Sequence, residues 1–122
     1  MYSISKRMEI AGAHDLKLDY ESKCSSPHGH NWVVTVYCKS DTLDNNGMVV
    51  DFTKLKKEIH DVLDHKYLNT ILSFNPTAEN IAEWICGKAT ECCNTPHGHC
   101  YKVSVQESEG NVAMYSTEEG TL

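Results

Sequence analysis

The sequence lacks any long apolar run. Nowhere in its 122 residues are there the roughly 20 consecutive apolar residues that a transmembrane helix requires. The first seven residues, Met1 to Arg7, also lack the apolar centre of a secretory signal peptide. We therefore expect a cytoplasmic protein without membrane partners. We also expect a single domain over residues 1–122, a length sufficient to bury a hydrophobic core.

An excess of positive charge is missing as well. The chain has 11 Lys and Arg against 17 Asp and Glu, which gives a formal net charge of −6 at pH 7. This balance makes nucleic acid and anionic membrane surfaces poor partners. An anionic small molecule remains a suitable partner, because it needs only a local basic pocket.

The cysteines do not show the pattern of a disulfide framework. Such frameworks are typical of short secreted chains, whereas Cys92 and Cys93 are adjacent here and the other four are scattered through periodic segments. We therefore expect reduced thiols.

Apolar periodicity predicts strands towards both ends of the chain and helices between them. Alternation predicts strands over residues 2–10, 28–39, 101–105 and 112–115. Helical spacing predicts two helices, capped by Asp51 and Thr77, of which the first runs to about Leu63 and the second ends before Pro96. The Asn46-Gly47 pair predicts a hairpin that leads into a strand at 48–50. The order of elements predicts an α+β fold, an antiparallel sheet with two helices packed on one face.

His28 and His30 carry the clearest chemical signal. Alternate residues of a strand project to the same side, and His14 follows the first predicted strand with the parity of its apolar face. Three neutral imidazoles leave an open position on zinc, as in catalytic sites. Cys24, four residues before His28, is either a fourth ligand, which would make the site closed and structural, or a reactive thiol beside it.

Two further segments contain candidate chemistry. In Asp64-His65, the carboxylate could orient the imidazole for proton transfer. Neighbours in sequence need not contact each other, however, and the alternative is that the two residues only form a polar helix end. His97-Gly98-His99 nearly repeats the first histidine pair and has cysteines close by, so it is a candidate for a second metal site.

Several motifs together resemble a known family. In order along the chain they are Ala13-His14, Cys24-x3-His28-Gly29-His30-Asn31, Gly47-x2-Val50-Asp51-Phe52, Leu63-Asp64-His65-x2-Leu68-Asn69, Pro76-Thr77-x-Glu79-Asn80 and Glu107. Each is weak alone, but six in this order are specific. The chain resembles the 6-pyruvoyl- and 6-carboxy-tetrahydropterin synthase family over most of its length.

The resemblance implies the tunnelling fold (T-fold), assembled into a homohexamer as a dimer of trimers. It implies that His14, His28 and His30 bind Zn²⁺ and that the substrate is 7,8-dihydroneopterin triphosphate. It assigns roles to six further residues. They are Cys24 as general base, Asp64 and His65 as a proton relay that usually serves a neighbouring subunit, Glu107 as the anchor of the pterin ring, and Thr77 and Glu79 as parts of the same pocket.

The short Cys24-x3-His28 spacing resembles the bacterial 6-carboxy branch of the family, the queuosine (deazapurine) precursor route. In that branch the substrate side chain is also cleaved, so that acetaldehyde is released together with triphosphate. The alternatives are a 6-pyruvoyl-tetrahydropterin synthase, which only eliminates triphosphate, a non-catalytic zinc-stabilised binding module, and a zinc hydrolase that uses a metal-bound water.

Overall fold

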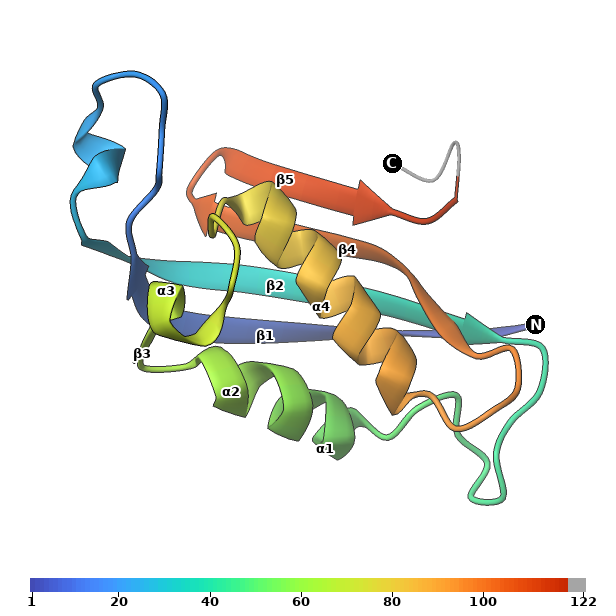
Figure 1. The fold of residues 1–122 in the computed structure, drawn as a ribbon. Helices are drawn as coiled ribbons and strands as arrows, with labels where there is room; N and C mark the ends of the chain where they lie inside the picture. Colours follow the sequence, from blue (N-terminus) through green and yellow to red (C-terminus); the bar gives the residue numbers. More distant parts are fainter. Residues whose placement is uncertain (119–122) are drawn as a thin grey trace.

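A single five-stranded sheet forms the framework of the chain (Figure 1). The computed structural model describes residues 1–118. The strand order across the sheet is β3-β1-β2-β4-β5. The bounds are β1 (Tyr2–His14), β2 (His28–Ser40), β3 (Lys66–Tyr67), β4 (His99–Ser108) and β5 (Asn111–Ser116). The four longer strands are those that alternation predicts.

The sheet is mixed, which corrects one part of the prediction. β1, β2, β4 and β5 pair antiparallel as expected, but β3 runs parallel to β1 and pairs only with Gly12 and Ala13. Two residues are too few to show a period of two, so this strand has no sequence signal. The α+β class itself is confirmed.

Helices occupy the chain between β2 and β4. The first predicted helix is one continuous helical segment. It consists of α1 (Phe52–Leu55), a π-helical turn (Lys56–His60) and α2 (Asp61–Leu63). A short helix, α3 (Leu68–Ile71), follows it, and α4 (Ala78–Cys92) is the second predicted helix. Both predicted caps are confirmed, because Asp51 accepts a hydrogen bond from the Thr53 amide and Thr77 accepts one from the Asn80 amide. Within residues 1–118, none of the helices has the length and apolar composition needed to cross a bilayer.

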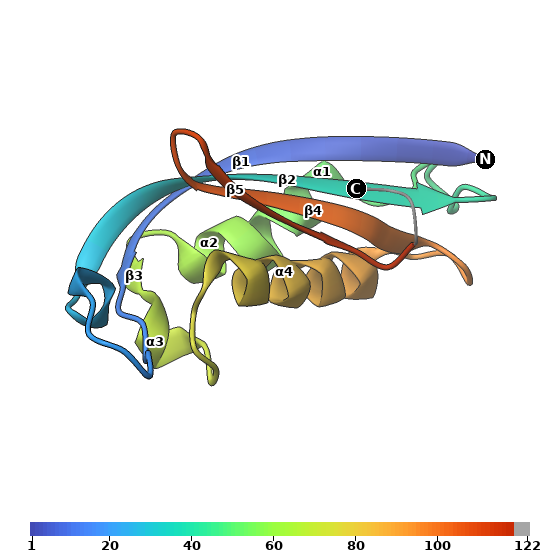
Figure 2. The same cartoon turned by 90° about the horizontal axis from the view of Figure 1, so that it is seen from above.

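The helices cover one face of the sheet, as Figure 2 shows from above. The even-numbered residues of β2 from Trp32 onward point to this face and are buried. Opposite them, α4 contributes its own buried stripe, which includes Ile81, Ile85 and Ala89. The core therefore lies between β2 and α4, where the apolar face of the strand packs against the apolar face of the helix.

The predicted hairpin after β2 is wrong. The turn exists, since the Gly47 amide donates to the Asp44 carbonyl at 3.0 Å, but residues 48–50 form no strand. β2 already has β1 on one edge and β4 on the other, so no edge is free for a further strand. Val49 and Val50 are instead buried in the core.

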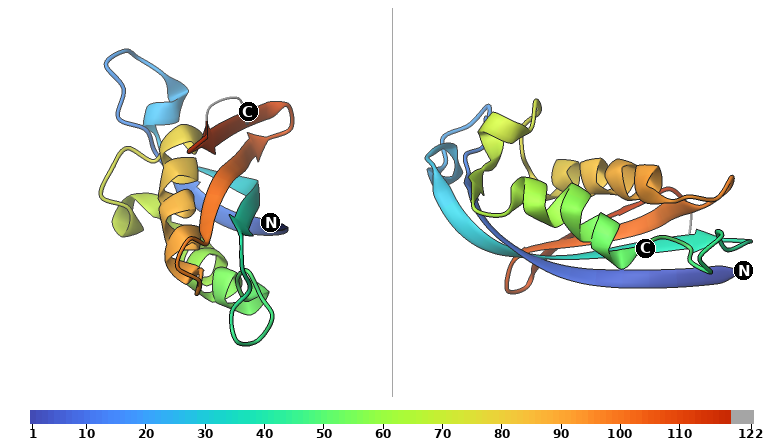
Figure 3. Two further views of the ribbon diagram at one scale, coloured as in Figure 1. Left: turned by 90° about the vertical axis from the view of Figure 1, so that its right-hand side faces the viewer. Right: turned by 90° about the horizontal axis from the view of Figure 1, so that it is seen from below.

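The ribbon formed by β1 and β2 bends towards the helices at one end (Figures 2 and 3). This end contains the last residues of β1 and the first residues of β2. The bend therefore brings the histidine-bearing ends of both strands towards α3 and the start of α4.

Candidate metal centre

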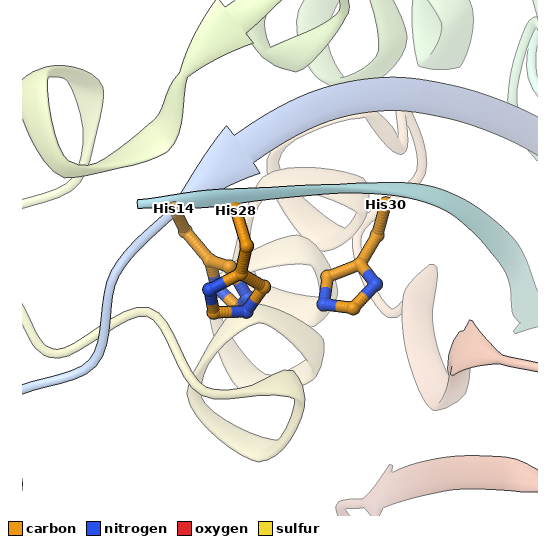
Figure 4. A group of neighbouring side chains, drawn as sticks. All are labelled: His14, His28 and His30. Carbon is orange, nitrogen blue, oxygen red and sulfur yellow. The ribbon is translucent and has the colours of Figure 1, made fainter. Parts of the chain in front are cut away.

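Three histidines meet at the bent end of the sheet (Figure 4). His14 is the last residue of β1 and lies directly opposite His28, the first residue of β2. His30 follows two residues later on the same face. One ligand nitrogen of each ring lies within 4.8 Å of the other two. The strand pairing thus gathers residues that are far apart in the sequence, and the group could hold a metal ion.

Backbone carbonyls orient two of the rings. The Nδ1–H of His14 donates to the Pro76 carbonyl at 2.8 Å, and the Nδ1–H of His28 donates to the Ser26 carbonyl at 2.8 Å. A carbonyl can only accept, so each ring carries its proton on Nδ1 when it is neutral. The Nε2 lone pair of both rings is then available to a cation.

Two of the other ring nitrogens lack a hydrogen-bond partner within residues 1–118. The Nε2 atoms of His14 and His30 are buried without a hydrogen bond among the described residues. Burial lowers the pKa of both imidazoles, which favours the neutral form that binds metal. A buried polar atom without a partner costs roughly 1–3 kcal/mol, and a bound cation would remove that cost.

Glu107 lies next to this group. Its Oε1 is 3.3 Å from Nε2 of His30, a contact that lacks hydrogen-bond geometry. The register of β4 against β5 shifts between Gln106 and Ser108, so Glu107 sits at an irregularity of the kind that re-aims side chains beside functional sites. A hollow of about 330 Å³ opens here, and its lining includes Glu79 and Glu107.

Cys24 lies outside the histidine group. It is in a 3-10 turn (Lys23–Ser25), where its carbonyl accepts from the Leu16 amide at 2.8 Å, and its thiol is partly exposed. In residues 1–118 the only group of ligand atoms compact enough for a metal contains no cysteine. This arrangement does not place Cys24 as a fourth ligand.

Asp64 and His65 do contact each other. The Nδ1–H of His65 donates to Oδ2 of Asp64 at 2.7 Å, while the other carboxylate oxygen accepts from the Ala11 amide at 2.9 Å. The Ala11 bond, together with the neighbouring imidazoles, lowers the pKa of Asp64. The amide of His65 also donates to the Ala11 carbonyl. The pair is therefore anchored to β1.

This pair borders a different hollow from that of Glu107. The lining of this second hollow, of about 380 Å³, includes Ala11, Asn31, Asp64 and His65. Ala11 and Asn31 are strand partners, and their side chains project away from the face that carries His30. Within one chain, the imidazole of His65 thus borders a hollow on the other side of the strands from the face that carries His30.

His60 belongs to none of the family motifs, but it lies beside Asp64 in the structure. Its Nε2 is 3.8 Å from Oδ2 of Asp64, and its Nδ1 is 2.9 Å from Oδ1 of Asp61. The spacing of four residues between His60 and Asp64 on a predicted helix was the available signal.

The remaining candidates lie elsewhere. Thr77 uses its hydroxyl to cap α4, and no described contact relates it to a ligand.

His97 and His99 lie at the opposite end of the sheet, where His99 pairs with Lys39 near the end of β2. The Nε2 of His99 is 3.4 Å from Glu118. Up to residue 118, the structure gathers no second set of metal ligands there.

These features define an α+β protein with a three-histidine group, at the bent end of its sheet, that could hold a metal ion. A family model described as 6-pyruvoyl tetrahydropterin synthase matches residues 3–118. The chain belongs to this family.

Two relatives carry the same name, 6-carboxy-5,6,7,8-tetrahydropterin synthase. The protein from Synechocystis is 38% identical over 124 residues, covering 94% of this chain and 93% of the relative. The protein from Bacillus subtilis is 30% identical over 130 residues, covering 99% and 89%. Among solved structures, the 6-pyruvoyl tetrahydropterin synthase of Caenorhabditis elegans superposes with a TM-score of 0.74 at 28% identity, covering 96% of each chain. The T-fold expectation is confirmed.

Proposed function

We propose that this chain is a zinc-dependent lyase in the cytoplasmic pathway to queuosine and related deazapurines. It converts 7,8-dihydroneopterin triphosphate and water to 6-carboxy-5,6,7,8-tetrahydropterin, acetaldehyde and triphosphate. The pterin ring gains the two hydrogens that the side chain loses, so no external oxidant or reductant is needed. Family membership and the names of the two relatives support this proposal. The observation that carries it is the pair of buried Nε2 atoms, on His14 and His30, that lack a hydrogen-bond partner among residues 1–118.

The residues present fit a zinc ion. Three imidazoles are a ligand set of catalytic zinc sites, in which a fourth position stays open. When bound by His14, His28 and His30, zinc supplies a Lewis acid that stabilises negative charge on the side-chain oxygens of the substrate. The bonds from Nδ1 of His14 and His28 to backbone carbonyls hold two of the ligand rings in place.

Glu107 is proposed as the anchor of the pterin ring. A carboxylate only accepts hydrogen bonds, and the amino and ring N–H groups of a pterin form a donor edge. The contact between Glu107 and His30 places this acceptor beside the histidine group. Glu79 lines the same hollow and Thr77 caps the helix that carries it, so both are proposed to help shape the pocket.

Cys24 is proposed as the general base. Its thiol is partly exposed and free of the ligand group, which leaves it available to take a proton from the hydroxyl-bearing carbon of the substrate. His65 is proposed to return a proton from its ring. Asp64 holds the Nδ1–H of that ring, so Nε2 is the atom that exchanges the proton.

We further propose a homohexamer of two trimers, in which each Asp64–His65 pair serves the histidine group of a neighbouring copy. The Asp64–His65 pair and Glu107, which lies beside His30, line two different hollows of one chain, and this separation supports the arrangement. So do the strand edges, because within residues 1–118 β5 has no outer partner strand and β3 covers only two residues of β1. Unpaired strand edges are templates for pairing with another chain.

Product analysis tests the proposed reaction. Zinc-loaded protein is incubated with 7,8-dihydroneopterin triphosphate, and the products are identified by mass spectrometry, with chelator-treated protein as the control. We expect acetaldehyde and the carboxy pterin in equal amounts. A pyruvoyl pterin without acetaldehyde would place the chain in the other branch of the family. Bound metal without turnover of the substrate would favour a binding module.

Subunit complementation tests the shared site. Cys24→Ala and Asp64→Asn are each expected to be inactive as homo-oligomers. Co-expression of the two variants with separate tags, followed by tandem purification, gives mixed oligomers. Recovery of activity in these oligomers is the expected result. Mixed oligomers that remain inactive would contradict the assignment of the Asp64–His65 pair to a neighbouring copy.

A further inference from the structure

Two asparagine side chains hold residues 15–17, the segment that follows β1 and passes close to α3 (Figures 2 and 3). Oδ1 of Asn69 accepts from the Asp15 amide at 2.9 Å, and Nδ2 of Asn69 donates to the Asp15 carbonyl at 2.9 Å. Asn75 makes the same pair of bonds two residues further on, at 2.8 Å with the Lys17 amide and at 3.0 Å with the Lys17 carbonyl. Each side-chain amide thus takes the place of the backbone of a partner strand.

The bonds to the two asparagines leave from one edge of this segment. In an extended chain, a residue presents its N–H and C=O to one edge and the next residue presents its own to the opposite edge. Asp15 and Lys17 face the asparagines, so Leu16 faces away from them. On that opposite edge the Leu16 amide donates to the Cys24 carbonyl at 2.8 Å. Residues 15–17 therefore connect the asparagines on one side with the backbone of Cys24 on the other.

The loop between β1 and β2 depends on these asparagines for its place against the helices. Among residues 1–118, the hydrogen bonds that join residues 15–27 to the helical part of the chain come from the side chains of Tyr67, Asn69 and Asn75. The Tyr67 hydroxyl donates to the carboxylate of Asp15 and leaves the backbone of the loop untouched. The backbone of the loop is thus bound to that part of the chain through the two asparagines.

The same part of the chain also orients a ligand of the candidate metal centre. Pro76 follows Asn75 directly, and its carbonyl accepts from Nδ1 of His14 at 2.8 Å. Asn75 itself binds the backbone of Lys17. Two consecutive residues therefore fix both the ring of a proposed metal ligand and the loop that carries Cys24.

We propose that Asn69 and Asn75 are positioning residues for the thiol of Cys24. They act through the backbone of residues 15–17 and through the bond from the Leu16 amide to the Cys24 carbonyl. A general base must lie within hydrogen-bond reach of the proton that it removes, and a misplacement of about 1 Å can cost about 10²-fold in rate. This positioning role rests on the proposed function, in which Cys24 is the general base.

The test combines amide hydrogen exchange with steady-state kinetics for Asn69→Ala and Asn75→Ala. The Leu16 amide is bonded to Cys24 rather than to either asparagine, yet its exchange, followed by NMR, should become about 2- to 10-fold faster because the segment around it is released. In the zinc-loaded protein kcat should fall by about 10- to 100-fold, while KM and zinc content stay unchanged. Asn94→Ala, a change at an exposed asparagine after α4, is the matched control and should alter none of these values.

A milder variant covers the case in which circular dichroism shows an alanine variant to be unfolded. Asn75→Asp keeps an oxygen for the Lys17 amide but loses the donor to the Lys17 carbonyl, so the same changes are expected in the same direction. Unchanged exchange at Leu16, or a fall in kcat accompanied by loss of zinc or by an equal rise in KM, would overturn the positioning role. Failure of the proposed function would appear differently, as a parent protein without turnover or a fully active Cys24→Ala at any exchange rate, and either result would overturn the positioning role as well.

Discussion

The Nδ1–H of His14 donates to the carbonyl of Pro76 at 2.8 Å. This bond joins the last residue of β1 to the segment that begins α4, across 62 positions in the sequence. It turns Nε2 of His14 towards the rings of His28 and His30. The geometry of the candidate metal centre therefore depends on where α4 packs against the sheet.

Removal of any one of the three histidines should abolish metal binding. His14→Ala, His28→Ala and His30→Ala each delete a ligand, and the loss of zinc affinity should exceed the about 10- to 100-fold that loss of an outer-shell partner costs. Metal content after dialysis against a competing chelator measures this. Cys24→Ala and the distant His97→Ala should retain zinc. Loss of zinc from Cys24→Ala would instead identify the thiol as a ligand.

The metal-free protein should lose stability in mild acid. Burial lowers the pKa of His14 and His30 below the ordinary value of 6.5, so below pH 6.5 the unfolded chain binds more protons than the native chain. Stability should therefore rise with pH up to about 6.5, by at most about 1.4 kcal/mol per pH unit for each group, and then level off. Urea unfolding at a series of pH values measures the slope. His14→Asn should flatten it, whereas His97→Asn should not.

The Asp64–His65 pair should affect turnover but not metal content. Asp64→Asn keeps an oxygen for the Ala11 amide but no longer holds the imidazole by charge, so kcat should fall by about 10²–10⁴-fold. For His65 the suitable variant is Asn, because φ at this position is 58° and Asn tolerates left-handed backbone well. Steady-state kinetics and zinc analysis on the same samples provide the check. Unchanged kcat in both variants would exclude the proton relay.

Glu107→Gln should weaken substrate binding. It replaces a charged acceptor with an amide, and hydrogen bonds to charged groups contribute roughly 1.5–3 kcal/mol. KM should therefore rise by about 10- to 100-fold while zinc content stays the same. Glu109→Gln, an exposed change two residues along the chain, is the matched control. Equal KM values for the two variants would remove Glu107 from the pocket.

Gly12→Ala should destabilise the fold, because the added Cβ would lie 3.0 Å from the Lys66 carbonyl oxygen and 3.3 Å from the Trp32 ring. The β1–β3 contact is too close for it, and overpacking of this kind costs about 1–3 kcal/mol. Gly87→Ala is the contrasting change, since a Cβ there meets nothing within 4 Å in an exposed helical position. It should stabilise the protein by about 0.5–1 kcal/mol. Urea midpoints of the two variants should move in opposite directions.

Prediction from the sequence succeeded where the signal is local. The period of two in β1 and β2 placed His14, His28 and His30 on one face, and the side chains of Asp51 and Thr77 marked both helix starts. It failed where the outcome depends on competition between distant segments. Residues 48–50 have the composition of a strand, but both edges of β2 were already occupied. β3 forms only because the chain that follows α2 lies alongside the end of β1 and pairs with it.

The sequence by itself determined the chemistry available to this protein: which side chains can bind a metal, which share a strand face, and which motifs belong to the family. Only the tertiary structure decided how they meet. The Pro76 carbonyl behind His14, the Ala11 amide on Asp64, and the separation of Asp64 from the histidine group all arise from contacts between segments more than 40 residues apart. Backbone periodicity does not encode such contacts, because they depend on how the sheet bends and on where the helices pack against it.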